Sequence, residues 1–170
     1  DVRGSDHDVR VNEHTRLIAF DNHVKGLSSD PQIAGQQFEN VTRYVLNHAD
    51  IPGLRGVVGV ERYESFAEKM NRQYGIKRIP ARDTGIDFIV HLESGDIATV
   101  QAKTARKSKA NVDAFQKLAH LSRRIEDTGS TVRVRAMLVV TSEATLAGAE
   151  EAQASGIQIV NRHAIARYLD

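Results

Sequence analysis

Two neighbouring segments with the alternation of β-strands, separated by a short turn, constrain the fold of this chain most. Residues 84–103 read TGIDFIVHLESGDIATVQAK. From Ile86 to Leu92 every second residue is apolar, which is typical of a half-buried strand. Residues 94–96, Ser-Gly-Asp, interrupt this pattern, and a second strand is expected at 97–103. The stretch therefore predicts an antiparallel hairpin.

The length of the turn decides which polar side chains share a face of the hairpin. Gln101 and Lys103 are two residues apart and project from the same face of their strand. A two-residue turn would place Asp87 opposite Ala102, on the other face. A three-residue turn of residues 94–96, with its glycine in a left-handed conformation, places Asp87 opposite Lys103. We expect this second register, which brings Asp87, Gln101 and Lys103 together.

A helix is expected before the hairpin, beginning near Ser29-Asp30-Pro31. A capping residue there precedes a proline at an early helical position. Glu39 lies at the edge of the helix's apolar stripe, where it is either an ordinary exposed acid or a residue of a functional site. The stripe itself repeats at helical spacing and comprises Ile33, Phe38, Val41, Val45 and Leu46.

The other elements alternate between strands and helices. A strand is expected at 56–60 and a helix at 62–74, and the glycines of the strand (GVVGV) fit turns better than a phosphate loop. A helix at 111–126 separates the hairpin from a buried strand at 132–141. Such a connection implies a right-handed crossover and parallel pairing of the strands that contain Gln101 and Leu138. The expected remaining elements are a helix at 145–155, a strand at 157–160 and a helix beginning at Asn161.

These elements predict an α/β fold, a mixed β-sheet flanked by helices on both faces. With 170 residues the chain fits one domain. Residues 1–12 are polar without periodicity and are expected to be loosely held, followed by a short amphipathic element at 13–23. We therefore divide the chain into an N-terminal extension, 1–28, and a domain, 29–170. Because the sequence starts with Asp1, we expect it to be a piece of a longer protein.

Composition restricts the function classes without choosing one. The net charge is +1, from 23 basic and 22 acidic residues, and cysteine is absent, so disulfides and thiolate zinc sites are excluded. No stretch is long and apolar enough for a membrane span, and a cytoplasmic location is expected. Basic residues concentrate just after the hairpin, as either a solvated helix face or a track for phosphates. They are Lys103, Arg106, Lys107, Lys109, Lys117, Arg123 and Arg124.

The hairpin motif resembles the PD-(D/E)XK nuclease superfamily. DTGID at 83–87 followed by QAK at 101–103 is similar to its Mrr-type restriction endonuclease branch, in which glutamine replaces the usual acid. GQQFENVTRYVL at 35–46 is similar to the family's first helix, and residues 138–169 to its closing strand, helix, strand and helix. The DTGID sequence is similar to the corresponding motif in the nuclease domain of helicase-coupled restriction enzymes. Together the segments span residues 35–169.

The resemblance implies a restriction-endonuclease-like fold, with 29–170 as a Mrr-like nuclease domain, and it implies residue roles. Asp87 would be the main ligand of a Mg²⁺ ion, with Mn²⁺ as a substitute. Gln101, the backbone carbonyl of Ala102 and Glu39 would complete the site, directly or through water. Lys103 would orient or deprotonate the attacking water and stabilise the phosphoryl oxygens. The phosphate track would then include Arg106, Lys107 and Lys109.

Other interpretations of the same residues remain open. Asp87 and Lys103 could form a cross-strand ion pair without chemistry. Ile86 stands where the family has proline, which leaves the metal-binding carboxylate unchanged. Gln101 supplies an oxygen but no charge, which weakens a cation site. The histidines lack an i,i+4 pair, so a zinc site is not expected, and His91 is expected to be structural.

The leading hypothesis is a metal-dependent endonuclease domain that cleaves double-stranded DNA, of restriction or phage-defence type. The resemblance implies a helicase, translocase or specificity domain in the same parent chain, and a homodimer for double-strand cleavage. The alternative from another class is a catalytically silent nucleic-acid-binding module on the same fold. A junction resolvase or an RNA-cleaving relative is a further alternative within the fold.

Overall fold

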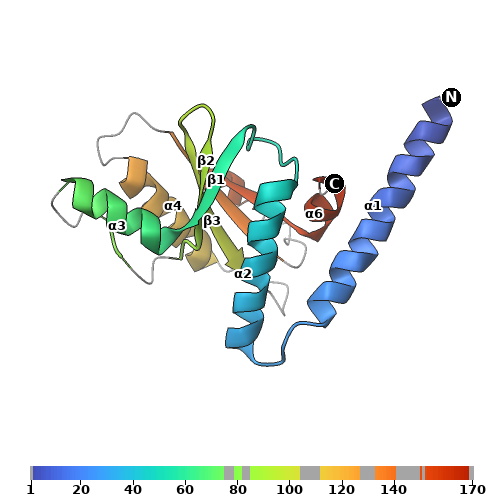
Figure 1. The fold of residues 1–170 in the computed structure, drawn as a ribbon, viewed down its shortest axis with the longest axis horizontal. Helices are drawn as coiled ribbons and strands as arrows, with labels where there is room; N and C mark the ends of the chain where they lie inside the picture. The colour runs from blue at the N-terminus through green and yellow to red at the C-terminus, as the bar shows by residue number, and fades with distance from the viewer. Residues whose placement is uncertain are drawn as a thin grey trace.

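A mixed β-sheet with the strand order β1-β2-β3-β4-β5 forms the centre of the computed structural model (Figure 1). The structure describes residues 2–74, 79–81, 85–103, 112–126, 133–140, 150 and 152–168. In chain order the elements are α1 Val2–Lys25, α2 Pro31–His48, β1 Val57–Arg62, α3 Tyr63–Tyr74, β2 Phe88–Leu92, β3 Ile97–Lys103, α4 Val112–Glu126, β4 Val134–Val140, β5 Ile157–Val160 and α6 Arg162–Tyr168.

Strand pairing follows the predicted topology. β1, β2 and β3 are antiparallel neighbours, whereas β3, β4 and β5 are parallel. Gln101 pairs with Leu138, as the crossover argument predicted. The sheet has helices on both faces (Figure 1), so the predicted fold class, α/β with a mixed sheet between helices, is confirmed.

The predicted register of the hairpin is wrong by two residues. Phe88 pairs with Val100 and His91 with Ile97, which makes Glu93, rather than Ser94, the first turn residue. The turn does have three residues, and Gly95 at its third position has a φ of +87°. A shift of two residues preserves the faces of the strands, because side chains alternate with a period of two. Gln101 and Lys103 therefore still share a face, but Asp87 lies opposite Gln101 in this register and not opposite Lys103 as predicted.

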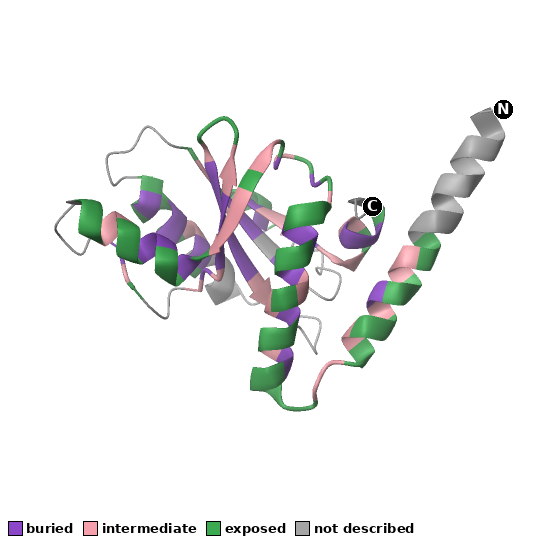
Figure 2. Cartoon of the chain, in the orientation of Figure 1, coloured by how far each residue is buried: buried purple, intermediate pink, exposed green. Residues whose placement is uncertain are grey.

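Two hydrophobic cores lie on opposite sides of the sheet, and Figure 2 shows buried residues along the strands and the inward sides of the helices. One core joins the sheet to α3 and α4, through Tyr63, Ile89 and Leu118 among others. The other core joins it to α2 and α6 and includes Phe38 and Val100. Odd-numbered residues of β3 face α4, and even-numbered residues face α2.

Helix α2 begins as predicted. Asp30 caps it, because its carboxylate accepts hydrogen bonds from the N–H groups of Gln32 and Ile33 at 2.9 and 3.4 Å, and Pro31 follows at the first helical position. One member of the predicted stripe is wrong, since Ile33 is 48% exposed and Ala34 takes the buried position. Phe38, Val45 and Leu46 of the stripe are buried, and Val41 packs against them.

The N-terminal segment differs from its prediction. Residues 2–25 form the single helix α1, where a loosely held tail and a short element were expected. This helix packs beside α6, and the Asp21 carboxylate accepts a hydrogen bond from Arg162 at 3.0 Å. The division of the chain at residue 28 stays a prediction.

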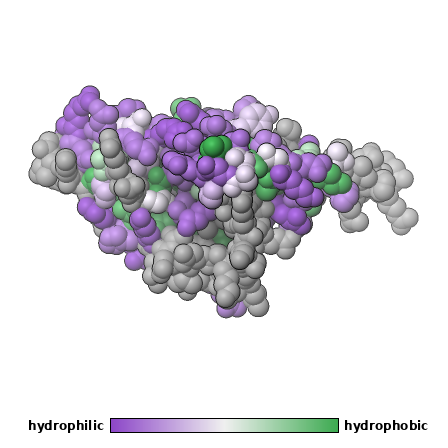
Figure 3. Space-filling model, turned by 90° about the horizontal axis from the view of Figure 1, so that it is seen from below, coloured by the Kyte–Doolittle hydropathy of each residue, from purple (hydrophilic) through white to green (hydrophobic). Residues whose placement is uncertain are grey.

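The surface seen in Figure 3 is mainly hydrophilic over its described residues, with small separate hydrophobic areas. None of the described helices combines the length and the hydropathy that a membrane crossing requires.

Candidate active site

Asp87 lies one residue before β2, at the open end of the hairpin. Its backbone N–H donates to the carbonyl of Val100 at 2.8 Å, and its carbonyl accepts from the N–H of Tyr63 at 3.0 Å. Its carboxylate Oδ2 accepts a hydrogen bond from the N–H of Ala102 at 2.7 Å. The carboxylate therefore lies against β3 between Gln101 and Lys103.

The strand alternation breaks at this point, which explains the position of the carboxylate. Ile86 and Ile89 both lie in the core beside α3 and α4, although residues three apart on a regular strand face opposite sides. The Asp87 side chain takes the place of a backbone partner and satisfies the N–H of Ala102. The carboxylate is consequently fixed at the end of the sheet, within reach of residues from both faces.

Glu39, from α2, is the second carboxylate at this point. Burial raises the pKa of Asp87, the N–H of Ala102 partly offsets this, and the charge and hydrogen bond of Glu39 raise the pKa further, to about 6. Glu64 at the start of α3 adds a smaller increase. Two acids this close cannot both ionise without cost, so the pair favours either a shared proton or a bound cation.

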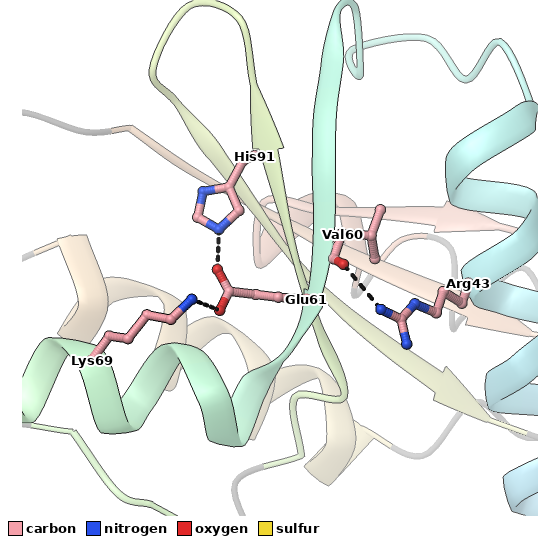
Figure 4. Close-up of polar contacts among 5 residues, drawn as sticks. All are labelled: Arg43, Val60, Glu61, Lys69 and His91. Atoms are coloured by element: carbon pink, nitrogen blue, oxygen red, sulfur yellow. Dashed lines mark hydrogen bonds and ion pairs between the residues drawn. The ribbon is translucent and has the colours of Figure 1, made fainter.

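Two arginines hold the α2 side of the site. Arg62, the last residue of β1, donates a hydrogen bond from Nη1 to Glu39 Oε2 at 3.5 Å. Arg43, one helical turn after Glu39, donates to the carbonyl of Val60 at 3.4 Å, which ties α2 to β1 (Figure 4). This contact fixes the position of the helix that carries Glu39.

Gln101 faces α4 and is almost fully buried, with 9% of its surface exposed. Its Oε1 atom has no hydrogen-bond partner among the described residues. A buried acceptor without a partner costs about 1–3 kcal/mol. Such an atom in an otherwise well-bonded strand is typical of a site that is completed by a ligand.

Lys117 is a residue of this site that the motif analysis did not assign. Gly85 has a φ of +74°, and a Cβ atom built on it would lie 3.3 Å from Lys117 Cδ and 3.5 Å from Gln101 Nε2. The lysine stem and the amide therefore cover the same glycine. No local sequence signal places Lys117 here. In the structure α4 returns along β3, as the Thr99–Ser122 hydrogen bond of 2.7 Å shows, so a residue one turn or more before Ser122 approaches Gln101.

The predicted site residues lie at one end of the sheet, with Gln101 and Lys103 on the α4 side and Glu39 on the helix that packs against the other side. Lys103 ends β3, is half-buried, and shares the α4-facing side with Gln101. Asp87 contacts Ala102 and lies beside Glu39. The predicted phosphate contacts Arg106, Lys107 and Lys109 lie outside the described residues.

The donor atoms fit a hard cation such as Mg²⁺ or Mn²⁺. Within the described residues no three His, Cys, Asp or Glu side chains form a metal-binding group, so the two carboxylates would act with neutral oxygens. Gln101 Oε1 and the carbonyl of Ala102 supply such oxygens, and Mg²⁺ usually keeps several water ligands. The unpartnered Oε1 and the raised pKa of Asp87 are the structural observations that agree with this assignment.

A second charged cluster joins β1, β2 and α3 (Figure 4). The Glu61 carboxylate contacts His91 Nε2, and Lys69 Nζ lies 3.0 Å from its other oxygen. Burial would raise the pKa of Glu61, but hydrogen bonds from His91 and Lys69 outweigh it and leave the pKa below its ordinary value. The His91 ring also lies 6.2 Å from that of Phe66. These contacts agree with a structural role for His91.

Comparisons with known proteins give only weak structural likeness. No family model matches the chain, and no curated protein matches it. A solved structure, a repair endonuclease from Pyrococcus abyssi, superposes with a TM-score of 0.38 and 17% sequence identity, over 58% of this chain and 46% of that one. The match thus spans less than half of the endonuclease chain. At this TM-score and identity the likeness assigns no activity, so a functional argument rests on the site itself.

Proposed function

We propose that this chain is a metal-dependent nuclease domain that hydrolyses phosphodiester bonds of double-stranded DNA. The observation that carries the proposal is the juxtaposition of two carboxylates, Asp87 and Glu39: burial together with the charge and hydrogen bond of Glu39 raises the pKa of Asp87 to about 6. The adjacent strand β3 carries Gln101, whose buried Oε1 has no partner among the described residues. Lys103 ends the same strand. Acids, neutral oxygens and a lysine are what hydrolysis of a phosphodiester requires.

Each residue has a role in this proposal. Asp87, Glu39, Gln101 Oε1 and the carbonyl of Ala102 would hold the cation, which supplies polarisation of the phosphate when bound. The hydrogen bond from the N–H of Ala102 keeps the Asp87 carboxylate directed at the end of β3. Lys103 Nζ orients the attacking water, or accepts its proton, and stabilises charge on the phosphoryl oxygens.

The proposal extends to features that the described residues leave untested. Arg106, Lys107 and Lys109 would contact the DNA backbone immediately after the site. A restriction or phage-defence role, with a helicase or specificity domain in the parent chain and a homodimer for double-strand cleavage, follows from the motif resemblance.

A catalytically silent nucleic-acid-binding module is the second candidate. The observation that favours it is Gln101, which leaves two carboxylates where three would bind a divalent ion more tightly. This candidate predicts DNA binding that is unchanged by divalent ions, and no cleavage.

Cleavage of supercoiled plasmid by the purified chain separates the two candidates. We expect nicked or linear product with Mg²⁺ or Mn²⁺ and none with EDTA. Asp87→Asn should abolish cleavage and weaken Mn²⁺ binding measured by calorimetry, whereas Glu61→Gln, which changes a carboxylate on the neighbouring strand β1, should retain both. DNA binding without metal-dependent cleavage, by the chain alone or in its parent protein, would establish the silent module instead.

A further inference from the structure

Arg62 pairs with Glu39, one of the two acids of the candidate site. It ends β1, and its Nη1 atom lies 3.5 Å from Glu39 Oε2. Its guanidinium carbon lies 5.9 Å from the centre of the Phe88 ring. Arg62 and Phe88 are register partners across β1 and β2, so this side of the guanidinium rests on the sheet while the other side faces α2. The positive charge is therefore held at Glu39 by two separate contacts.

The charges of the site indicate what this arginine does. Burial, together with the charge and hydrogen bond of Glu39, raises the pKa of Asp87 to about 6. Arg62 compensates part of the negative charge while the site holds no cation. A divalent ion that binds Glu39 must compete with the guanidinium for the same carboxylate, and it then lies close to a like charge.

The Arg62–Glu39 ion pair is weak enough for a divalent ion to replace the arginine. The Arg62 side chain is 50% exposed and that of Glu39 is 24% exposed, so the ion pair is partly screened by water and its net worth is small. A guanidinium released from Glu39 remains at the mouth of the site, where its fork of donors matches phosphate oxygens. Breaking the pair therefore costs little and leaves a phosphate-binding group in place.

We propose that Arg62 is the resident counter-ion of Glu39, which lowers the affinity of the empty site for divalent ions. This inference rests on the proposed function, because it requires a cation at Glu39 and Asp87. Arg62 thereby raises the concentration of divalent ion that is needed to occupy the site. The consequence is a site that stays largely free of divalent ions until their concentration, or the charge of a bound phosphodiester, overcomes the arginine.

Mn²⁺ binding to the full chain without DNA, measured by calorimetry and by the loss of the free-ion electron paramagnetic resonance signal, tests the proposal. Arg62→Gln and Arg62→Met remove the charge, and the methionine keeps an apolar stem on Phe88. Both variants should bind Mn²⁺ roughly three- to tenfold more tightly than the wild type, the range expected for removal of one screened charge near a divalent ion. Arg62→Lys should remain close to the wild type.

A matched control is present on α3. Arg72 pairs with Glu68 at the surface, so Arg72→Gln makes the same change in net charge away from the site and should leave Mn²⁺ affinity unchanged. If both charge-removing Arg62 variants bind Mn²⁺ as the wild type does or more weakly, while Asp87→Asn still weakens binding, only the role of Arg62 is overturned. Absence of Mn²⁺ binding in every variant overturns this inference and the proposed metal site together.

Discussion

Two carboxylates on neighbouring strands, Asp87 and Glu61, have opposite electrostatic surroundings. Asp87 lies beside another acid, and burial together with Glu39 raises its pKa to about 6. Glu61 is also partly buried, yet His91 and Lys69 bond to its two oxygens and leave its pKa below the ordinary value. We call Glu61 a matched acid, because cationic or hydrogen-bond-donating side chains contact both of its oxygens, and Asp87 an unmatched acid, because its neighbour is another carboxylate.

The difference separates a candidate functional acid from a structural one. A matched acid such as Glu61 joins β1, β2 and α3 and gains nothing from a further ligand (Figure 4). An unmatched acid lowers the free energy of unfolding when it is ionised, and favourable interactions elsewhere in the fold must offset this loss. Asp87 is therefore the acid at which we propose that a cation binds, and the predictions below compare the two clusters.

The largest expected difference is in catalysis. Lys103→Ala should lower single-turnover DNA cleavage roughly 10²- to 10⁴-fold, the range for loss of a group that moves a proton in the transition state. DNA affinity should stay nearly constant, because Lys103 acts on charge that develops during the reaction. Lys69→Ala, the matched loss of a lysine at Glu61, should leave cleavage unchanged. Proportional losses of cleavage and binding in Lys103→Ala would make Lys103 an ordinary phosphate contact.

The second difference concerns stability against pH in EDTA. An acid whose pKa is raised in the folded state binds more protons when folded, so its ionisation destabilises the fold as pH rises from about 4 to about 6. The difference between 3.8 and about 6 corresponds to roughly 3 kcal/mol as an upper estimate. Asp87→Asn, whose amide oxygen can still accept from Ala102, should therefore gain free energy of unfolding relative to the wild type between pH 4 and pH 7. Urea unfolding at both pH values measures this gain, and a constant difference would mean that the pKa of Asp87 is not raised.

Local signals made part of this molecule predictable from sequence. The cap at Asp30, the strand that contains Leu138 and its parallel pairing with the Gln101 strand were predicted from local rules, and these three predictions are confirmed. The face on which a strand residue lies depends only on whether its position is odd or even, so the two-residue error in register did not change the faces of the residues in β2 and β3. These rules placed Gln101 and Lys103 on one face and brought Asp87 to the same end of the sheet.

Contacts between distant segments were beyond the sequence. Arg62 lies 23 positions from Glu39, and Lys117 lies 32 positions from Gly85, and no local pattern pairs them. The start of the turn at Glu93 was also missed, because SGD and ESG are both acceptable three-residue turns and the packing of the strands chose between them. Helix α1 lacked an apolar stripe at residues 1–12, and its contact with α6 was not visible in its own sequence.

A smaller effect is expected from restoring a charge. Gln101→Glu should tighten Mn²⁺ binding about tenfold at pH 8, because it adds a carboxylate to a hard-oxygen site. The neighbouring Lys117 stem brings a positive charge that offsets part of the gain. Gln73→Glu on the exposed side of α3 is the control for net charge and should leave calorimetric affinity unchanged. Equal affinity of Gln101→Glu and the wild type would place residue 101 outside the ligand set.

The smallest expected effect is a change in stability at the matched acid, Glu61, with the opposite pH dependence to that of Asp87. Glu61 has a lowered pKa, so its contribution to stability is present above its ordinary value of 4.5 and is lost as pH falls through its lower folded value. Glu61→Gln should therefore lose about 1 kcal/mol or less at pH 7, the range for partly exposed ion pairs, and should approach the wild type below about pH 4. Urea unfolding in EDTA measures both variants under the same conditions, with Asp87→Asn gaining stability towards neutral pH and Glu61→Gln losing it. If the stability difference from the wild type changes with pH in the same direction for both variants, the distinction between the two acids is wrong. The electrostatic argument for a cation at Asp87 then fails.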